Sequence, residues 1–152
     1  MHPYTYTLSF RISHPERDLA DAYARLGKLQ GFTPGRIWKA GESRSTPTGL
    51  PLEGKYEVSY CHFKLFDSDS ENVQTSEHAG LATTIDRALD ILLQEKELLL
   101  EISSSGSNLE FFIGWYIGSN SGEMFDLALL QKLTELRIAL SFDVYSSEED
   151  SK

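Results

Sequence analysis

The sequence has a single cysteine among its 152 residues, which excludes a disulfide within the chain. It also lacks long apolar runs, since stretches such as 98–100 and 111–113 are far shorter than the roughly 20 residues of a membrane-spanning helix. The first residues, MHPYTYTLSFRIS, show neither an apolar signal segment nor the arginine-rich pattern of a transit peptide. These absences favour a soluble, cytoplasmic protein.

Positive charge is scarce as well. The chain has 14 Lys and Arg residues against 23 Asp and Glu residues, a net charge of -9. Because such a chain repels a polyanion, nucleic acid is not an expected partner. The exception is the segment 28–55, in which basic residues outnumber acidic ones. An anion site formed by Arg36, Lys39 and Arg44 is one interpretation, and a solvated loop is the other.

Motifs for catalysis, metals and cofactors are missing too. The four histidines are scattered, with no pair at the spacing of a zinc site. Cys61 precedes His62, but adjacent strand residues point to opposite faces, so a buried, inert thiol is expected rather than a nucleophile. The segment 118–122, GSNSG, lacks the ending of a phosphate-binding loop. It is predicted to be a strand-to-helix turn, capped by Asn120 or Ser121.

What the sequence does contain is alternation of apolar and polar residues, which predicts strands. Two segments, 4–12 and 138–145, alternate cleanly, whereas 55–66 changes phase and predicts a β-bulge near Tyr60 and Cys61 or burial on both faces. The segment 109–117 is apolar on both faces. The residues predicted to face the core in the two alternating segments are Tyr4, Tyr6, Leu8, Phe10, Ile12, Ile138, Leu140, Phe142 and Val144.

Helical spacing occurs between these strands. Ser13 and Glu16 have the spacing of a capping box, which predicts a helix that buries Leu19, Tyr23 and Leu26 and ends at Gly27. Leucine periodicity predicts one long or two short helices over 77–103. Another helix is predicted over 123–136, with Phe125, Leu129, Leu133 and Leu136 facing the core. Between them, 31–54 contains five glycines and three prolines, so it is predicted to be a long loop with a short strand at 36–39.

This order of elements predicts an α+β fold. One mostly antiparallel sheet would pack two or three helices on one face, as a two-layer sandwich, because only 109–117 is apolar enough for burial on both sides. Residues 1–146 would form a single globular domain. Residues 147–152 would form a disordered acidic tail.

Several pieces of the chain, in order, resemble the domain-of-unknown-function 4279 family, a set of small, mainly bacterial proteins. They are YTYTLSFRI, ARLG, GFTPGRIWKAGESR, IDRALDILLQ and LLQKLTELRIALSFDVY, and together they span residues 4–145. The family commonly has a Trp where this chain has Tyr56 or Tyr60. The resemblance implies no activity, cofactor or site residue.

The side of the sheet away from the helices is the main functional lead. Arg11, Phe112, Tyr116 and Asp143 are expected there, and such a mixture of aromatic and charged groups is typical of a recognition surface. In the alternative interpretation, the 31–54 loop covers Phe112 and Tyr116. The other residues expected on this side are Ser9, Glu57, Ser59 and Ser141.

The sequence therefore favours a non-enzymatic module that binds a protein partner or its own copy, in an immunity-like or regulatory role. The alternative is a protein that binds a small anionic ligand between the 31–54 loop and the sheet. An enzyme is the third possibility.

Overall fold

The computed structural model describes residues 2–66, 73–77 and 79–146, and its centre is strand β1 (Thr5–His14). The alternation predicted at the start of the chain is confirmed, because Tyr4, Tyr6, Leu8, Phe10 and Ile12 are all buried. The three described strands that pair with β1 all run antiparallel to it. The strands, in their order across the sheet, are β2 (Phe32–Trp38), β5 (Ser59–Leu65), β1, β7 (Asn108–Ile117) and β8 (Ile138–Ser146), with β6 (Gln74–Thr75) pairing beside β1.

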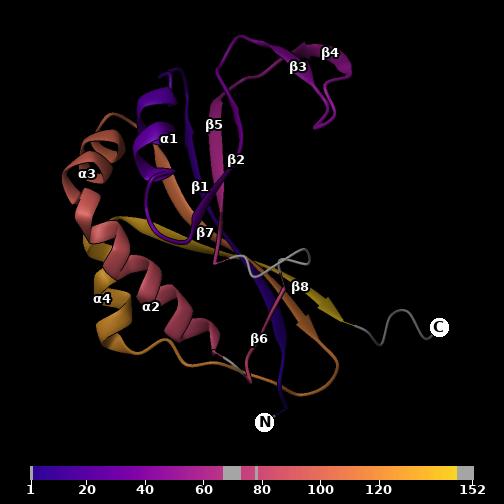
Figure 1. Ribbon diagram of the computed structural model, residues 1–152, viewed down its shortest axis with the longest axis vertical. Helices are drawn as coiled ribbons and strands as arrows, with labels where there is room; N and C mark the ends of the chain where they lie inside the picture. The colour runs from indigo at the N-terminus through magenta and orange to yellow at the C-terminus, as the bar shows by residue number, and fades with distance from the viewer. Residues whose placement is uncertain (1, 67–72, 78, 147–152) are drawn as a thin grey trace.

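All four α-helices of the described residues lie on one side of this sheet (Figure 1). Among the described strands, only β8 runs parallel to its neighbour, β7. The α+β fold with a mostly antiparallel sheet and helices on one face is therefore confirmed. There are four helices because the 77–103 segment is divided by a short 3-10 turn. The bounds are α1 (Ala20–Leu26), α2 (Leu81–Leu92), the turn η1 (Leu93–Glu95), α3 (Lys96–Ser104) and α4 (Leu127–Glu135).

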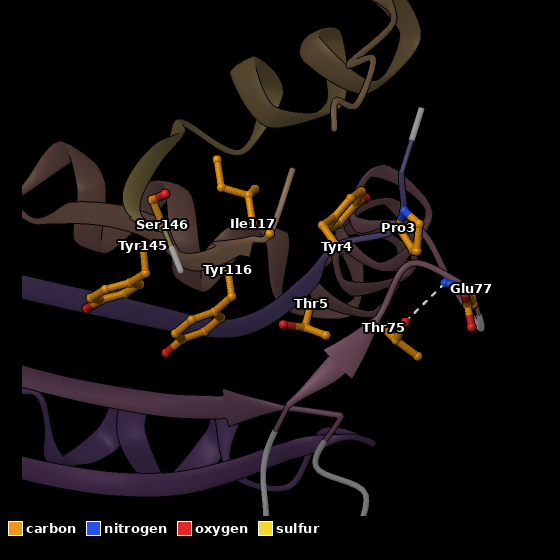
Figure 2. Close-up of a pocket in the computed structure, with 10 residues that line it drawn as sticks. Pro3, Tyr4, Thr5, Thr75, Glu77, Tyr116, Ile117, Tyr145 and Ser146 are labelled. Carbon is orange, nitrogen blue, oxygen red and sulfur yellow. Dashed lines mark hydrogen bonds between the residues drawn. The ribbon is translucent and has the colours of Figure 1, made fainter. Parts of the chain in front are cut away.

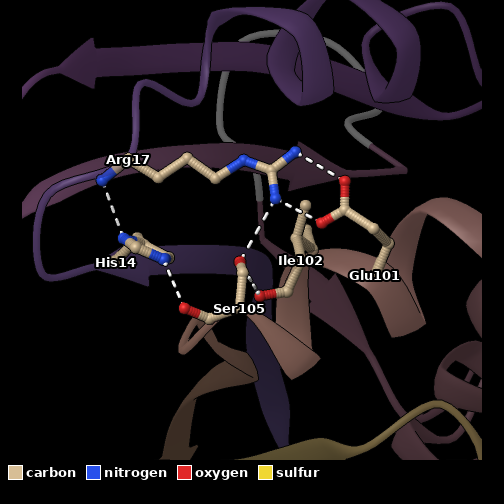
Figure 3. A network of polar contacts seen from close by, with 5 residues as sticks. All are labelled: His14, Arg17, Glu101, Ile102 and Ser105. Atoms are coloured by element: carbon tan, nitrogen blue, oxygen red, sulfur yellow. Dashed lines mark hydrogen bonds and ion pairs between the residues drawn. The ribbon is translucent and has the colours of Figure 1, made fainter.

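The capping box predicted before α1 is wrong, because Ser13 belongs to β1 and the helix begins only at Ala20. His14 stabilises the turn before α1 instead. Its Nδ1 atom accepts the N–H groups of Glu16 and Arg17, while Nε2 bonds to the carbonyl oxygen of Ser105 at 2.9 Å (Figure 3). Arg17 in turn pairs with Glu101 of α3. This network fastens the end of β1 to the end of α3.

The segment 31–54 does not form a loop over the sheet. Its first part, β2, pairs with the edge of β5, which satisfies backbone groups that would otherwise be unpaired. Its second part forms a separate two-stranded sheet of β3 (Ser43–Ser45) and β4 (Pro51–Lys55), which projects beyond the end of the main sheet (Figure 1). The prediction that this segment roofs Phe112 and Tyr116 is therefore wrong.

The phase change in 55–66 has a different cause from the one predicted. Strand β5 begins only at Ser59, so residues 56–58 precede it and no bulge is needed at Tyr60 and Cys61. The irregularity lies in β2, between Pro34 and Ile37. As a consequence, Ser59 is buried on the helix side, and Glu57 lies in a bend outside the sheet. Neither Ser59 nor Glu57 therefore lies on the side of the sheet away from the helices, where both were predicted.

The C-terminal elements follow the prediction with two differences. Helix α4 buries Leu129 and Leu133 as expected, but its N-cap is Asp126, whose Oδ1 accepts the N–H of Leu129, rather than Asn120 or Ser121. Ile138 of β8 is buried, whereas Phe142 and Val144 remain 42% and 59% exposed because β8 is an edge strand. The predicted tail, 147–152, lies outside the described residues.

Candidate functional site

The outer face is the side of the sheet opposite to the helices, and strand register decides which residues meet on it. One row across the strands places Arg11 between His62 of β5 and Glu110 of β7. The next rows contain Lys64, Ser9, Phe112 and Ser141, then Thr7, Gly114 and Asp143, and then Thr5, Tyr116 and Tyr145. All four residues predicted as a recognition surface, Arg11, Phe112, Tyr116 and Asp143, therefore lie on this face.

Arg11 and Phe112 form the centre of the outer face. The guanidinium carbon of Arg11 lies 3.7 Å from the centroid of the Phe112 ring, which is a cation–π contact. Next to them, the hydroxyl of Ser141 donates a hydrogen bond of 2.7 Å to Glu110. Arg11 and Phe112 are neighbours because the register places them diagonally on the adjacent strands β1 and β7, where long side chains can reach each other.

Tyr116 and Asp143 belong to a second cluster, toward the other end of β7. The ring of Tyr116 stacks on that of Tyr145, with centroids 4.8 Å apart and planes 12° apart, and the Tyr145 hydroxyl donates to Asp143 at 2.5 Å. Both tyrosines stay largely accessible, at 39% and 46% exposure. They also line an open pocket of about 540 Å³ together with Thr5, Thr75 and Glu77 (Figure 2). The two clusters are separated by Gly114.

A third aromatic group was not predicted from the sequence. Trp38 of β2 stacks on Tyr56 and on Tyr60, with centroid distances of 4.3 and 4.5 Å, and Arg36 lies 4.9 Å from the Trp38 ring. The sequence signal for this group was weak, because Trp38 lies in the short strand predicted at 36–39, whose partner strand the sequence does not show, and Tyr56 lies outside β5. Pairing of Trp38 with Tyr60 brings the group to the outer face of β5.

Charge is divided across the outer face. Arg11, Arg36 and Lys64 lie on β1, β2 and β5, whereas Glu110 and Asp143 lie on β7 and β8. Burial lowers the pKa of His62 from its ordinary value, and nearby Arg11, Lys64 and Arg36 lower it further. His62 is therefore neutral at pH 7. Burial raises the pKa of Tyr60.

The three cations predicted as an anion site are not brought together. Arg36 donates to the carbonyl oxygen of Ser45 and to the Tyr56 hydroxyl, and Arg44 donates to the carbonyl oxygen of Glu53. The pocket beside them is lined by Arg36 and Lys55, but not by Lys39 or Arg44. An anion site in this segment stays a prediction. Of its three cations, only Arg36 lines the described pocket.

Cys61 points to the core, opposite to His62, and its thiol is fully buried. Burial raises the pKa of this thiol to about 12, so the reactive thiolate is disfavoured. Within the described residues, no three His, Cys, Asp or Glu side chains gather as metal ligands would. None of the helices in that part of the chain combines the length and apolarity needed to cross a membrane.

Comparisons with known proteins give one match. The family model described as a domain of unknown function, DUF4279, matches residues 4–147, nearly the whole chain. Neither the curated proteins nor the solved structures give a match.

Proposed function

The chain belongs to the DUF4279 family, and for this member we propose a non-enzymatic function: it associates with a second copy of itself through the outer face. The observation that carries the proposal is a set of aromatic rings on a sheet face that no described helix covers, of which Tyr116 and Tyr145 are 39% and 46% exposed. Such a self-associating module would act in the cytoplasm, in a regulatory or immunity-like role.

Aromatic side chains are the first support. Phe112, Tyr116, Tyr145, Trp38 and Tyr60 all lie on or at the edge of this face. Tyrosine and tryptophan supply large, rigid contact area together with a polar group, and they are enriched in the centres of protein interfaces. An open sheet face can bury them against a second sheet, as in two-sheet sandwiches.

Charge complementarity is the second support, and it favours a second copy as the occupant. A two-fold axis parallel to the strands would place β2 and β5 of one copy over β7 and β8 of the other. The strands that carry Arg36 and Lys64 would then face the strands that carry Glu110 and Asp143. Since the chain as a whole carries a charge of -9, two copies repel each other over most of their surfaces. The outer face is where this repulsion is offset.

Sedimentation velocity over a concentration series tests the proposal. We expect the wild type to associate and the double variant Phe112→Ser with Tyr116→Ser to sediment as a monomer, because two central rings are lost. The matched control is Leu127→Ser on α4, where an 84% exposed apolar residue lies away from the outer face. A second control, Ile113→Ala on the core face of the same strand, should lose stability by roughly 2–5 kcal/mol but keep its association.

A charge exchange tests the geometry. Lys64→Glu should weaken association, and adding Asp143→Lys to it should restore association, because opposite charges would again face each other. A wild type that stays monomeric at the highest concentration reached contradicts the proposal. Binding of a different protein to that monomer, lost in the Phe112 and Tyr116 variant, would assign the outer face to a heterologous partner instead.

A further inference from the structure

A second pocket lies at the end of the sheet where β1 finishes and β7 and β8 begin. It has a volume of about 460 Å³, which is within the range of small-molecule sites. We call it the sheet-end pocket. Its lining includes two guanidinium groups, Arg11 and Arg137, with Ser107, Asn108 and Glu110.

Two polar atoms of this lining are buried without a hydrogen bond. They are Nε of Arg11 and Oγ of Ser107, and both lack a hydrogen-bonding group within the part of the chain that the structure describes. Ser107 is only 7% exposed, so its hydroxyl is removed from bulk water. Buried donors without acceptors are rare in folded proteins, and each needs an explanation. Here both belong to residues of one pocket, which indicates an acceptor that the chain does not supply.

The edge of the Arg11 guanidinium that lacks a hydrogen bond defines the shape of that acceptor. The flat side of the guanidinium is occupied by the Phe112 ring, which leaves the edge that carries Nε–H. A guanidinium edge presents parallel N–H groups that match the two oxygens of a carboxylate. The hydroxyl of Ser107 can donate a further hydrogen bond to the same group.

Charge restricts the acceptor further. The lining has two cations and one carboxylate, Glu110, which already accepts a hydrogen bond from Ser141. One positive charge therefore remains to be balanced, which suits a monoanion. A phosphate dianion would place its additional charge near Glu110, where like charges repel.

We propose that the sheet-end pocket binds the carboxylate group of a small organic molecule, held by the Nε edge of Arg11, the hydroxyl of Ser107 and the charge of Arg137. The site differs from the 31–54 cations considered above. Arg11 and Glu110 also lie on the outer face, whereas Ser107 and Arg137 lie outside its rows. Acetate binding is measured separately from sedimentation, so the two proposals can fail independently.

Titration of the 15N-labelled protein with sodium acetate tests this site, with the Arg11 Nε–H resonance assigned by its loss in Arg11→Lys. Acetate should shift this resonance and the backbone amides of Ser107 and Asn108 along a saturable curve. Ser107→Ala should weaken acetate binding about ten-fold, because a hydrogen bond to the charged ligand is lost. Ser9→Ala, a serine of β1 that does not line the pocket, should leave the affinity unchanged.

A second variant, Glu110→Gln, should change the acetate affinity in the opposite direction. Glu110→Gln should tighten acetate binding, since it removes the negative charge that competes with the ligand, and a purely structural role for this lining predicts no such gain. Three results would overturn the proposal: an equal shift with sodium chloride at the same ionic strength, an unchanged affinity in folded Ser107→Ala, or tighter binding of inorganic phosphate than of acetate.

Discussion

Two neighbouring residues of β5, Cys61 and His62, show how strongly a single position decides the environment of a side chain. Cys61 is buried in the core, whereas His62 lies on the outer face, in one row with Arg11. Successive side chains of a strand point to opposite faces. The two groups therefore experience different causes of pKa change, burial alone for Cys61 and burial together with three cations for His62.

Cys61 should react slowly with a thiol reagent in the folded protein and rapidly after denaturation. Burial keeps the thiol protonated and out of reach of the reagent. Labelling followed by mass spectrometry, with and without urea, measures both rates. Rapid labelling of the folded protein would contradict the buried position of this residue.

His62 should make the protein less stable as the pH falls. In the unfolded chain its pKa is about 6.5, and in the folded protein it is lower, so the unfolded state takes up a proton first. The contribution to the free energy of unfolding is fully present above about pH 6.5 and decreases as the pH falls from there to the lower folded pKa. Urea unfolding across this interval should show the decrease.

His62→Asn is the control for this pH dependence. Its amide oxygen can replace Nδ1, which lies 3.3 Å from the N–H of Arg36, but it does not titrate. The variant should lose the part of the slope that His62 contributes. If wild type and variant keep the same slope, then another group is responsible.

At the scale of elements, α2 contributes most of its apolar face to the core. Leu81, Ile85, Ala88, Leu89 and Leu92 are all fully buried against the sheet. The helix has no side-chain N-cap of its own. Its position therefore depends on packing against the sheet and on contacts made from other elements. Leu89→Ala tests the packing, and Tyr4→Phe tests a contact from outside the helix.

Leu89→Ala should destabilise the protein by roughly 2–5 kcal/mol, because it leaves a cavity under the middle of α2. The free energy of unfolding from urea titration measures this loss. Leu93→Ala is the matched control, since Leu93 is 42% exposed in the turn η1 directly after α2 and its substitution should cost much less. A neutral Leu89→Ala would mean that α2 does not pack as described.

At the scale of the whole molecule, the two ends of β1 are fastened to different helices. At one end His14 bonds to the end of α3 (Figure 3). At the other end the Tyr4 hydroxyl accepts the N–H of Leu81, the first residue of α2, at 2.8 Å and donates to Glu123 before α4. Burial, followed by the bond to Glu123, raises the pKa of Tyr4. The central strand thereby fixes the helix layer on the sheet.

Tyr4→Phe should lower the free energy of unfolding by about 1–3 kcal/mol, because it leaves the Leu81 N–H and the Glu123 carboxylate without their bond to the tyrosine. The ring and its stacking on Trp115, at 4.3 Å, are kept. Tyr145→Phe, an exposed tyrosine with one hydrogen bond, is the control and should cost less. Equal losses of stability in the two variants would mean that the hydrogen bonds of Tyr4 do not stabilise the helix layer more than an exposed hydrogen bond does.

Local spacing in the sequence predicted several of the elements and the faces that they bury. Alternation in β1 and helical spacing at Leu129, Leu133 and Leu136 predicted buried residues that the structure confirms. The same reasoning placed Arg11, Phe112, Tyr116 and Asp143 on one face. These patterns are readable because strands repeat every two residues and helices every 3.6, so local spacing alone identifies the buried side.

Tertiary structure alone decided which strands become neighbours. Only a short strand at 36–39 was predicted in this region, whereas β2 extends over Phe32–Trp38, because the open edge of β5 supplies the backbone partners that local sequence cannot show. His14, rather than Ser13 and Glu16, organises the turn before α1 because its second ring nitrogen meets α3, distant in sequence. The sheet-end pocket arises in the same way. Arg11, Ser107 and Arg137 come together only because register and strand order place three separate segments at one end of the sheet.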